Sequence, residues 1–428
     1  MKYILHFIVF FVVFIYVIPR QSYGQEPKKV PDGTEGLSLE KRSEDSITKK
    51  LPPNEFKGPY STFRIGFGYI ADASTYVQDD VFKRQMDTAN IELDPTVNTR
   101  DFRILGSGVL TKVKRTIAWK FAYMYDGNEK VWMLRESGIT VGVPELKGHI
   151  FVGRTKEGFS LVKVMNGHSP WGYERQMALD VIPILADGIK WFGMLPKSKI
   201  FWNLGYYNDF ISKGQGFSTF AWQYVARIGW LPVNNPEKKQ TLHIATNLRY
   251  AKPLDGKITL KSRPESNNTP QLINTGSFET DHSNHIGAEV YYTNKRFTIG
   301  SEVVAHNFNS DKSDDHKFYG GNVMLSYSIT GGMRPYKTEG SIYGFIPVKR
   351  SIFKRGLGEI EAAVFASTLN LNSGAIKGGQ MWRITPMINW YLSKVIRFEI
   401  IYGYGVLDRY NLKGKVQFFE TRLQFTVM

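Results

Sequence analysis

The sequence predicts an all-β protein, a transmembrane antiparallel β-barrel of about 16 strands with short inner turns and long outer loops. Three observations predict this fold class. Apolar residues recur with a period of two from Tyr60 to the end of the chain, the connections alternate between short and long, and the N-terminus resembles an export signal. No later stretch is apolar over the ~20 residues that a membrane helix needs, so only strands closed into a barrel would cross a membrane.

The N-terminus has the features of a cleaved secretory signal. Lys2 precedes an apolar run from Ile4 to Ile18, and Ser22 and Gly24 place small residues before a cut at Gln25. A retained anchor is the alternative, but this run is shorter than the ~20 residues of a spanning helix. We therefore expect residues 1–24 to be a signal peptide and the mature protein to be exported.

The composition describes a basic protein without disulfides. The mature chain would carry 53 Lys and Arg against 39 Asp and Glu, and the sequence has no cysteine. Stability must then come from backbone pairing or extended packing. No basic helix or aromatic-interleaved groove points to nucleic acid, and no motif points to a cofactor. The glycines of Gly66-Phe67-Gly68 and Gly106-Ser107-Gly108 lie inside strands, where they indicate close packing or a bend rather than nucleotide binding.

Residues 25–58 differ in composition from everything that follows. They are charged, punctuated by proline and glycine and almost free of aromatic side chains. Such a segment cannot bury enough apolar surface to order itself. We expect a flexible polar periplasmic leader here, followed by the barrel over residues 59–428.

Strand phase is the strongest local signal. Phe63, Ile65 and Phe67 alternate with Arg64 and Gly66, which leaves one apolar face and one small or charged face. A soluble β-sandwich also alternates, but it would need a second sheet to cover so aromatic a face. The predicted strands are 60–76, 101–112, 115–126, 130–142, 148–155, 189–196, 199–210, 219–231, 240–251, 283–294, 295–307, 317–330, 357–369, 380–392, 394–406 and 415–428.

The connections follow the plan of an outer-membrane barrel. Short turns such as 144–147 and 294–295 alternate with longer polar loops at 77–100, 156–188 and 252–282, which we expect outside the cell. The connection 331–356 departs from this plan, because it should be a short inner turn. The last strand alternates as barrel-assembly signals do, although Met428 replaces the usual terminal aromatic residue.

Four segments carry a family resemblance. FRILGSGVLTKVKRTIAWKFAYMYDGN (102–128), GHIFVGRTKEGFSLVKVMNGHSPWGYERQMAL (148–179), FYGGNVMLSYSITGGMRPYKTEG (318–340) and NWYLSKVIRFEIIYGYGVLD (389–408) occur in this order. Together they resemble the phosphate-selective porin O and P family over most of the chain after Phe63. The resemblance implies a constriction loop at about 156–188 folded into the barrel, a long inner connection at the Arg-Pro-Tyr turn, and a homotrimer.

The strand phase predicts which cations face the lumen. Wall arginines and lysines focus an electric field that attracts anions, and arginine can hold phosphate oxygens with two hydrogen bonds. Glu289, Glu302, Glu399 and Glu420 also face inward, so the alternative is that wall cations pair with wall carboxylates and only stiffen the lumen. The predicted pore-lining cations are Arg64, Lys120, Arg227, Arg249, Arg383, Arg397 and Arg422.

Two residues of the 156–188 loop are predicted to face the narrowest part of the channel. Lys163 and Arg175 are chosen from its basic residues, and the alternative is that they lie in the outer vestibule or pair with Glu157 and Glu174. His282 and His285 lie in a polar loop without the ligand set of a metal site, so no metal is expected.

We therefore expect an outer-membrane porin of a Gram-negative bacterium, not an enzyme. It would give passive diffusion of small hydrophilic solutes, with anion preference and, more narrowly, phosphate selectivity. The expected partners are outer-membrane lipid, lipopolysaccharide, the barrel-assembly machinery and small anions such as phosphate. The alternatives are a non-conducting structural or adhesive barrel, and a barrel hydrolase, for which His243 has no matched serine nearby.

Overall fold

The computed structural model describes residues 53–211, 213 and 219–427. The predicted signal peptide, most of the predicted leader and Met428 lie outside the described residues. Among the residues that are described, no helix is long and apolar enough to cross a bilayer.

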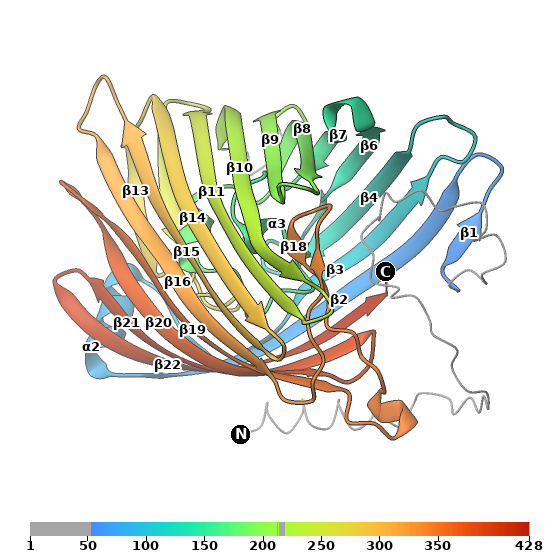
Figure 1. Ribbon diagram of the computed structural model, residues 1–428. Helices are drawn as coiled ribbons and strands as arrows, with labels where there is room; N and C mark the ends of the chain where they lie inside the picture. The colour runs from blue at the N-terminus through green and yellow to red at the C-terminus, as the bar shows by residue number, and fades with distance from the viewer. Residues whose placement is uncertain (1–52, 212, 214–218, 428) are drawn as a thin grey trace. The chain divides into compact units, whose positions relative to one another are not determined.

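A closed antiparallel barrel of 16 strand positions forms the body of the protein, which confirms the predicted fold class (Figure 1). The first wall strand pairs with the last, from Phe67 opposite Val427 to Gln78 opposite Val416, and this pairing closes the sheet. The wall consists of β2 Thr62–Gln78, β3 Thr96–Val109, β4 Ile117–Asp126, β5 Val131–Leu134 with β6 Ser137–Val143, β7 Gly148–Thr155, β8 Ala186–Leu195, β9 Ile200–Asn208, β10 Phe220–Asn235, β11 Gln240–Pro253, β14 His282–Asn294, β15 Phe297–Asn309, β16 His316–Ser328, β19 Glu359–Ser373, β20 Ile376–Tyr391, β21 Ile396–Arg409 and β22 Leu412–Val427.

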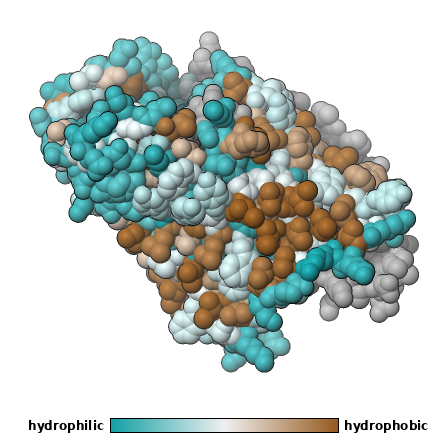
Figure 2. Space-filling view, turned by 90° about the horizontal axis from the view of Figure 1, so that it is seen from above, coloured by the Kyte–Doolittle hydropathy of each residue, from teal (hydrophilic) through white to brown (hydrophobic). Residues whose placement is uncertain are grey.

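The wall is apolar outside and polar inside, the reverse of a soluble protein. On β11, Ile244, Leu248 and Tyr250 are at least 40% exposed, whereas the alternate residues Asn247 and Arg249 are each 2% exposed. Figure 2 shows apolar residues gathered on one part of the surface and bordered by hydrophilic ones. An outer face of this kind is stable only against lipid, because exposing so many apolar side chains to water is unfavourable in free energy.

Most wall strands begin or end one to five residues away from their predicted bounds, and two segments differ further. The last residues of the predicted leader form β1, Glu55–Lys57, which pairs with β2. The strand predicted over 130–142 is divided into β5 and β6 at Arg135 and Glu136, and both pieces pair with β4. The break changes the direction in which the side chains of Arg135 and Glu136 point, as a β-bulge does.

The loop between β2 and β3 carries a short helix, α2 Asp80–Ala89. Asp79 caps it, because its side chain accepts a 2.7 Å hydrogen bond from the N–H of Phe82. Gln85 donates to the carbonyls of Leu407 and Leu412 at the end of the β21–β22 hairpin. The helix is thereby fixed to the rim where the long loops gather.

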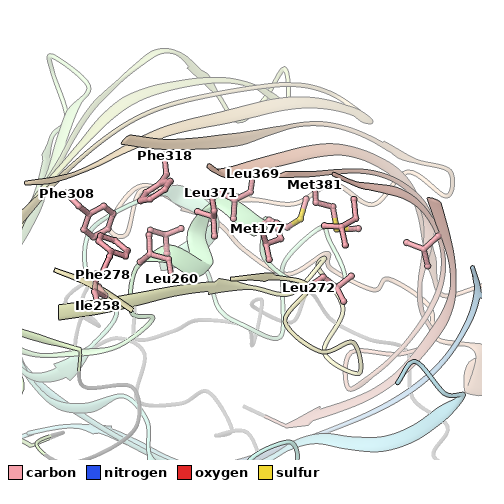
Figure 3. Packing of buried hydrophobic residues seen from close by; sticks show 14 of the residues in the cluster. Met177, Ile258, Leu260, Leu272, Phe278, Phe308, Phe318, Leu369, Leu371 and Met381 are labelled. Carbon is pink, nitrogen blue, oxygen red and sulfur yellow. The ribbon is translucent and has the colours of Figure 1, made fainter. Parts of the chain in front are cut away.

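The loop between β11 and β14 folds back into the barrel instead of remaining the polar outer loop that the sequence predicts. It forms a hairpin of β12 Lys257–Ser262 and β13 Ile273–Glu279. Leu260, Leu272 and Phe278 of this hairpin pack against Phe318 and Met381 of the wall (Figure 3). The mouth at the long-loop end is therefore covered by an apolar cluster.

The long inner connection between β16 and β19 also enters the lumen. It contains β17 Tyr336–Lys337, β18 Ile342–Tyr343 and the short helix η4 Ile352–Lys354. The Tyr336 hydroxyl lies 2.7 Å from His243 Nδ1 on β11, and Thr293 on β14 donates a 3.0 Å hydrogen bond to the Tyr343 hydroxyl. The barrel is thus narrowed from both ends on the side formed by β11 to β20.

Candidate functional site: the constriction and its charges

The segment between β7 and β8 folds against the inner wall and forms the constriction. It contains two short helices, α3 Leu161–Val164 and η3 Met177–Val181. The first N–H groups of α3 donate to wall carboxylates, Leu161 to Glu289 at 2.5 Å and Val162 to Glu302 at 3.1 Å. Acidic acceptors at a helix N-terminus satisfy N–H groups that have no partner inside the helix.

The middle of the segment is fixed to the opposite wall. His168 Nδ1 lies 2.7 Å from the Thr426 hydroxyl on β22, and Gln424 donates a 2.8 Å hydrogen bond to the His168 carbonyl. Asn389 on β20 donates to the Trp171 carbonyl at 2.9 Å. The constriction therefore crosses the lumen and is fixed to the wall on both sides.

All seven predicted pore-lining cations form ion pairs, and several of the acidic partners lie outside the wall strands. Three of the cations, Arg227, Arg249 and Arg383, have side chains that are 0% exposed. The pairs are Arg64 with Glu55 at 2.6 Å, Lys120 with Glu136 at 2.5 Å, Arg227 with Glu289 at 2.6 Å, Arg249 with Glu157 at 3.0 Å, Arg383 with Glu420 at 2.7 Å, Arg397 with Glu399 at 2.7 Å and Arg422 with Asp72 at 2.7 Å.

The two loop residues chosen from the sequence have different environments. Lys163 is 1% exposed and its Nζ lies 3.0 Å from Glu157 Oε2. Burial lowers the pKa of Lys163 to about 8, and attraction to Glu157 opposes that shift. Arg175 instead borders a small cavity in the constriction that Arg100, Arg103 and Glu174 also line.

Cations outnumber carboxylates around this cavity. We define the eyelet cluster as the cavity-lining Arg100, Arg103, Glu174 and Arg175 together with four charged neighbours, Asp101, Arg135, Glu136 and Lys156. It has five cations and three carboxylates. Burial lowers the pKa of Lys156 well below its usual range. Glu136 opposes that shift, and repulsion from Arg175, Arg135 and Arg103 adds to it.

The pairing inside the eyelet cluster is incomplete. Arg100 pairs with Glu174 at 2.6 Å, Arg103 pairs with Asp101 at 2.6 Å, and Lys156 lies 3.5 Å from Glu136. Within the described part of the chain, Arg135 and Arg175 lie in no ion pair of 4.0 Å or less. The eyelet cluster therefore keeps two guanidinium groups without an ion-paired carboxylate.

Several charged side chains in and beside the eyelet cluster are partly exposed to solvent. The side chains of Lys120 and Glu136 are 29% and 26% exposed, and those of Arg100 and Glu174 are 17% and 16% exposed. The buried pairs of Arg227 and Arg383 on the other side are not solvated at all. Solvent therefore reaches these four side chains, on or beside β3 to β6, but not the buried pairs of Arg227 and Arg383.

A family model described as phosphate-selective porin O and P matches residues 96–427. The chain belongs to this porin family. The match begins at the first residue of β3 and ends at the last residue of β22, so it includes the constriction and the whole eyelet cluster.

Solved structures share the barrel of this porin but little of its sequence. OmpT of Vibrio cholerae matches with a TM-score of 0.55 and 10% identity, over 87% of this chain and 100% of that one. An anion-selective porin from Comamonas acidovorans matches at 0.52 and 11%, over 85% and 100%. The outer-membrane channel DcaP of Acinetobacter baumannii matches at 0.54 and 10%, over 87% and 99%. No curated protein sequence matches the chain.

Some residues of the porin's constriction were missed by the sequence reasoning. Arg103 lies in the inward phase of β3, two residues after Asp101, so the alternation of that strand could have identified it. Arg135 could not be found in this way, because it lies in the break between β5 and β6, where the period of two is interrupted. Arg175 was identified, but only as one of two choices.

The histidines considered for a metal site are separated in the porin. His285 faces inward and its Nδ1 lies 2.8 Å from His306 Nδ1, whereas the His282 ring packs against Tyr250 on β11. Over the described ranges, no group of three or more His, Cys, Asp or Glu could hold a metal ion. His243 contacts Glu289 at 2.9 Å and Tyr336 at 2.7 Å.

Proposed function

We propose that this outer-membrane channel protein conducts small hydrophilic solutes passively and prefers anions. The observation that carries the proposal is the pair of guanidinium groups, Arg135 and Arg175, that lie in the eyelet cluster without an ion-paired carboxylate. Paired cations contribute little net field, so the seven wall cations first chosen from the sequence do not carry the proposal.

The size of the effect follows from Coulomb's law. One unit charge at 4 Å changes the energy of a passing ion by ~1 kcal/mol in bulk water, and by more where the walls exclude water. An anion is attracted and a cation is repelled by the same group. The two effects add to ~2 kcal/mol in the anion-to-cation permeability ratio. Removing one such charge should therefore lower that ratio by up to about thirtyfold at low salt, and by less when salt screens the charge.

Single-channel recording of the full mature chain in planar bilayers tests this proposal. Under a potassium chloride gradient, we expect a reversal potential of the sign that chloride selectivity gives. Arg135→Gln and Arg175→Gln should each shift it toward zero. The matched control is Lys312→Gln, which removes one exposed charge from the loop between β15 and β16, outside the eyelet cluster, and should leave the reversal potential unchanged.

Two results would contradict the proposal. Absence of conductance would favour the alternative of a structural or adhesive barrel that does not conduct. Cation preference in the unmodified chain would remove the role assigned to the eyelet cluster.

Phosphate selectivity is a narrower proposal that rests on the same cluster. A planar guanidinium can donate two hydrogen bonds to one phosphate, so the unpaired Arg135 and Arg175 of the eyelet cluster would hold such an ion more tightly than chloride. Phosphate would then block chloride current at concentrations far below that of the chloride, and Arg175→Lys would weaken the block while keeping the charge.

The predicted homotrimer is a further proposal, which the mass of the purified protein in detergent tests.

A further inference from the structure

The short turns that join the wall strands at one end of the barrel are strongly basic. The turns 110–116, 144–147, 196–199, 236–239, 295–296 and 392–395 hold eleven Lys and Arg and only two Glu. The loop 310–315 at the other end of the strands has the opposite character, since it holds three Asp and one Lys. Short turns of an outer-membrane barrel face the periplasm, so the basic rim lies at the periplasmic leaflet.

The cations of this rim are exposed and mostly without acidic partners. Ten of the eleven are exposed, and Arg115 with Glu145 at 2.9 Å forms the one ion pair within 4.0 Å that involves any of them, all six turns being described. Charges that only stiffened the turns would be paired with carboxylates. An unpaired set of one sign instead attracts a polyanionic surface or ligand.

Five cations of the same end converge on one pocket. Lys238 and Lys239 from the β10–β11 turn, Lys295 and Arg296 from the β14–β15 turn, and Lys349 from the inner connection line a pocket of 640 Å³, together with Glu237. Arg296 Nη1 donates a 3.3 Å hydrogen bond to the Ile329 carbonyl. This volume lies in the range of about 300–1,000 Å³ that small-molecule sites occupy.

The pocket adjoins the lipid-facing surface directly. Phe297 follows Arg296 in the chain and pairs with Tyr327 of β16, and the two are 40% and 47% exposed on the outer face. Aromatic residues at the end of a wall strand mark the level of the lipid headgroups. A ligand with a negative headgroup and acyl chains could therefore place the headgroup among the cations and the chains along Phe297 and Tyr327.

We propose that this rim pocket binds the phosphodiester headgroup of an anionic glycerophospholipid from the periplasmic leaflet. Such a lipid matches the charge of the five cations, the size of the pocket and the apolar wall beside it. The site is separate from the eyelet cluster, so it does not depend on the ion preference of the channel. Its role is to hold the barrel at a fixed depth and to recruit a defined lipid to this sector of the wall.

Native mass spectrometry of the full mature chain in detergent tests the assignment, with phosphatidylglycerol and zwitterionic phosphatidylcholine as probes. We expect phosphatidylglycerol to bind at least about tenfold more tightly, because each basic residue near a headgroup adds to the attraction. The triple variant Lys238→Gln, Lys295→Gln, Arg296→Gln should lose most of that preference. The matched control Lys83→Gln, Arg84→Gln, Lys312→Gln removes three exposed cations from the long-loop end and should bind like the unmodified chain.

Further measurements distinguish binding of the lipid from binding of a free anion, and distinguish a loss of binding from misfolding of a variant. Raising the salt concentration to 0.5 M should weaken phosphatidylglycerol binding by the unmodified chain. This test does not depend on whether a variant folds. A charge-retaining variant, Lys238→Arg with Lys295→Arg, should bind normally. Equal affinity for the two lipids would overturn the proposal, as would equal losses in the triple variant and its control. Complete displacement by millimolar inorganic phosphate would assign the pocket to a soluble anion instead.

Discussion

The imidazole of His168 lies directly on the backbone of Gly68, so closely that a Cβ added at Gly68 would overlap His168 Cε1. The glycine belongs to β2 and the histidine to the constriction. The ring is also held by Thr426, at 2.7 Å from Nδ1, and by Asp101, at 3.4 Å from Nε2. A glycine on the inner wall therefore provides the space in which the constriction is fixed near the eyelet cluster.

We predict that Gly68→Ala displaces His168 and loosens the middle of the constriction. Forcing extra atoms into a filled site costs about 1–3 kcal/mol of stability. Here this cost should destabilise the docking of the constriction on the wall rather than the fold of the barrel. Limited proteolysis within residues 166–176 should become faster, and single-channel current should become noisier. Gly106→Ala on the adjacent strand is the control, because its Cβ would meet nothing closer than Trp119 at 3.6 Å. Equal behaviour of the two variants would contradict the prediction.

The attachment of His168 should depend on pH. Burial and then repulsion from Arg103 lower the pKa of His168 from 6.5 to about 4, and the bond to Asp101 opposes this shift. A released His168 binds a proton more readily than the docked one. The docked state is therefore fully favoured above about pH 6.5 and loses up to about 3 kcal/mol as the pH falls toward 4.

Hydrogen exchange of the constriction between pH 4 and pH 7.5 measures this dependence, after correction for the intrinsic exchange rate. We expect protection at residues 166–172 to decrease on acidification. His168→Gln can keep a hydrogen bond to Thr426 but has no proton to gain, so its protection should not change in this range. A pH profile that is the same in both proteins would assign the effect to another group.

The hairpin of β12 and β13 should act as a cover over the channel. Leu260 is 2% exposed in the apolar cluster, and placing a carboxylate there costs several kcal/mol, roughly what would expel the hairpin from the mouth. Leu260→Asp should raise single-channel conductance. Thr259→Asp adds the same charge on the exposed face of the same strand and should leave conductance unchanged. The prediction fails if Leu260→Asp conducts like the unmodified chain.

Glu289 should be the strongest single attachment point of α3. It accepts from the Leu161 N–H and pairs with the buried Arg227 at 2.6 Å, so Glu289→Ala leaves both groups without their acceptor. Removing one member of a buried ion pair costs about 3–5 kcal/mol. We expect a lower melting temperature and faster cleavage within residues 158–165. Glu289→Gln keeps an acceptor for Leu161 but loses the charge, so an intermediate effect is expected, and an effect equal to that of Glu289→Ala would mean that the ion pair alone matters.

Local periodicity could predict the wall but not its electrostatics. The inward phase of Arg227 and Arg383 follows from alternation along each strand, and the structure has both inside the barrel. Their partners Glu289 and Glu420 lie 62 and 37 residues away. Pairing over such distances depends on strand register and on loop placement, which no local pattern contains. The prediction that these arginines serve anions is therefore replaced by the eyelet cluster in our proposal.

The placement of the loops also could not be predicted from local periodicity. The segment 252–282 is polar on average and was expected outside, yet Leu260, Leu272 and Phe278 form its buried side. Seven residues of alternation are too few to distinguish a hairpin that folds inward from a polar loop. The break at Arg135 is a second case, because a single irregular position reverses the phase on which the inward assignment depends.

The sequence by itself determined a closed β-barrel, because alternation, connection length and the absence of a later spanning helix each follow from neighbouring residues. Only the tertiary structure decided which cations are neutralised, where the constriction is fixed and which pocket the rim forms. The physical reason is that strand periodicity is a property of adjacent residues, whereas the field at any point in the lumen is a sum over charges from distant segments. Arg175 and Lys163 illustrate it: both lie in one loop, yet Lys163 pairs with Glu157, whereas Arg175 borders the cavity that Arg100 and Arg103 line.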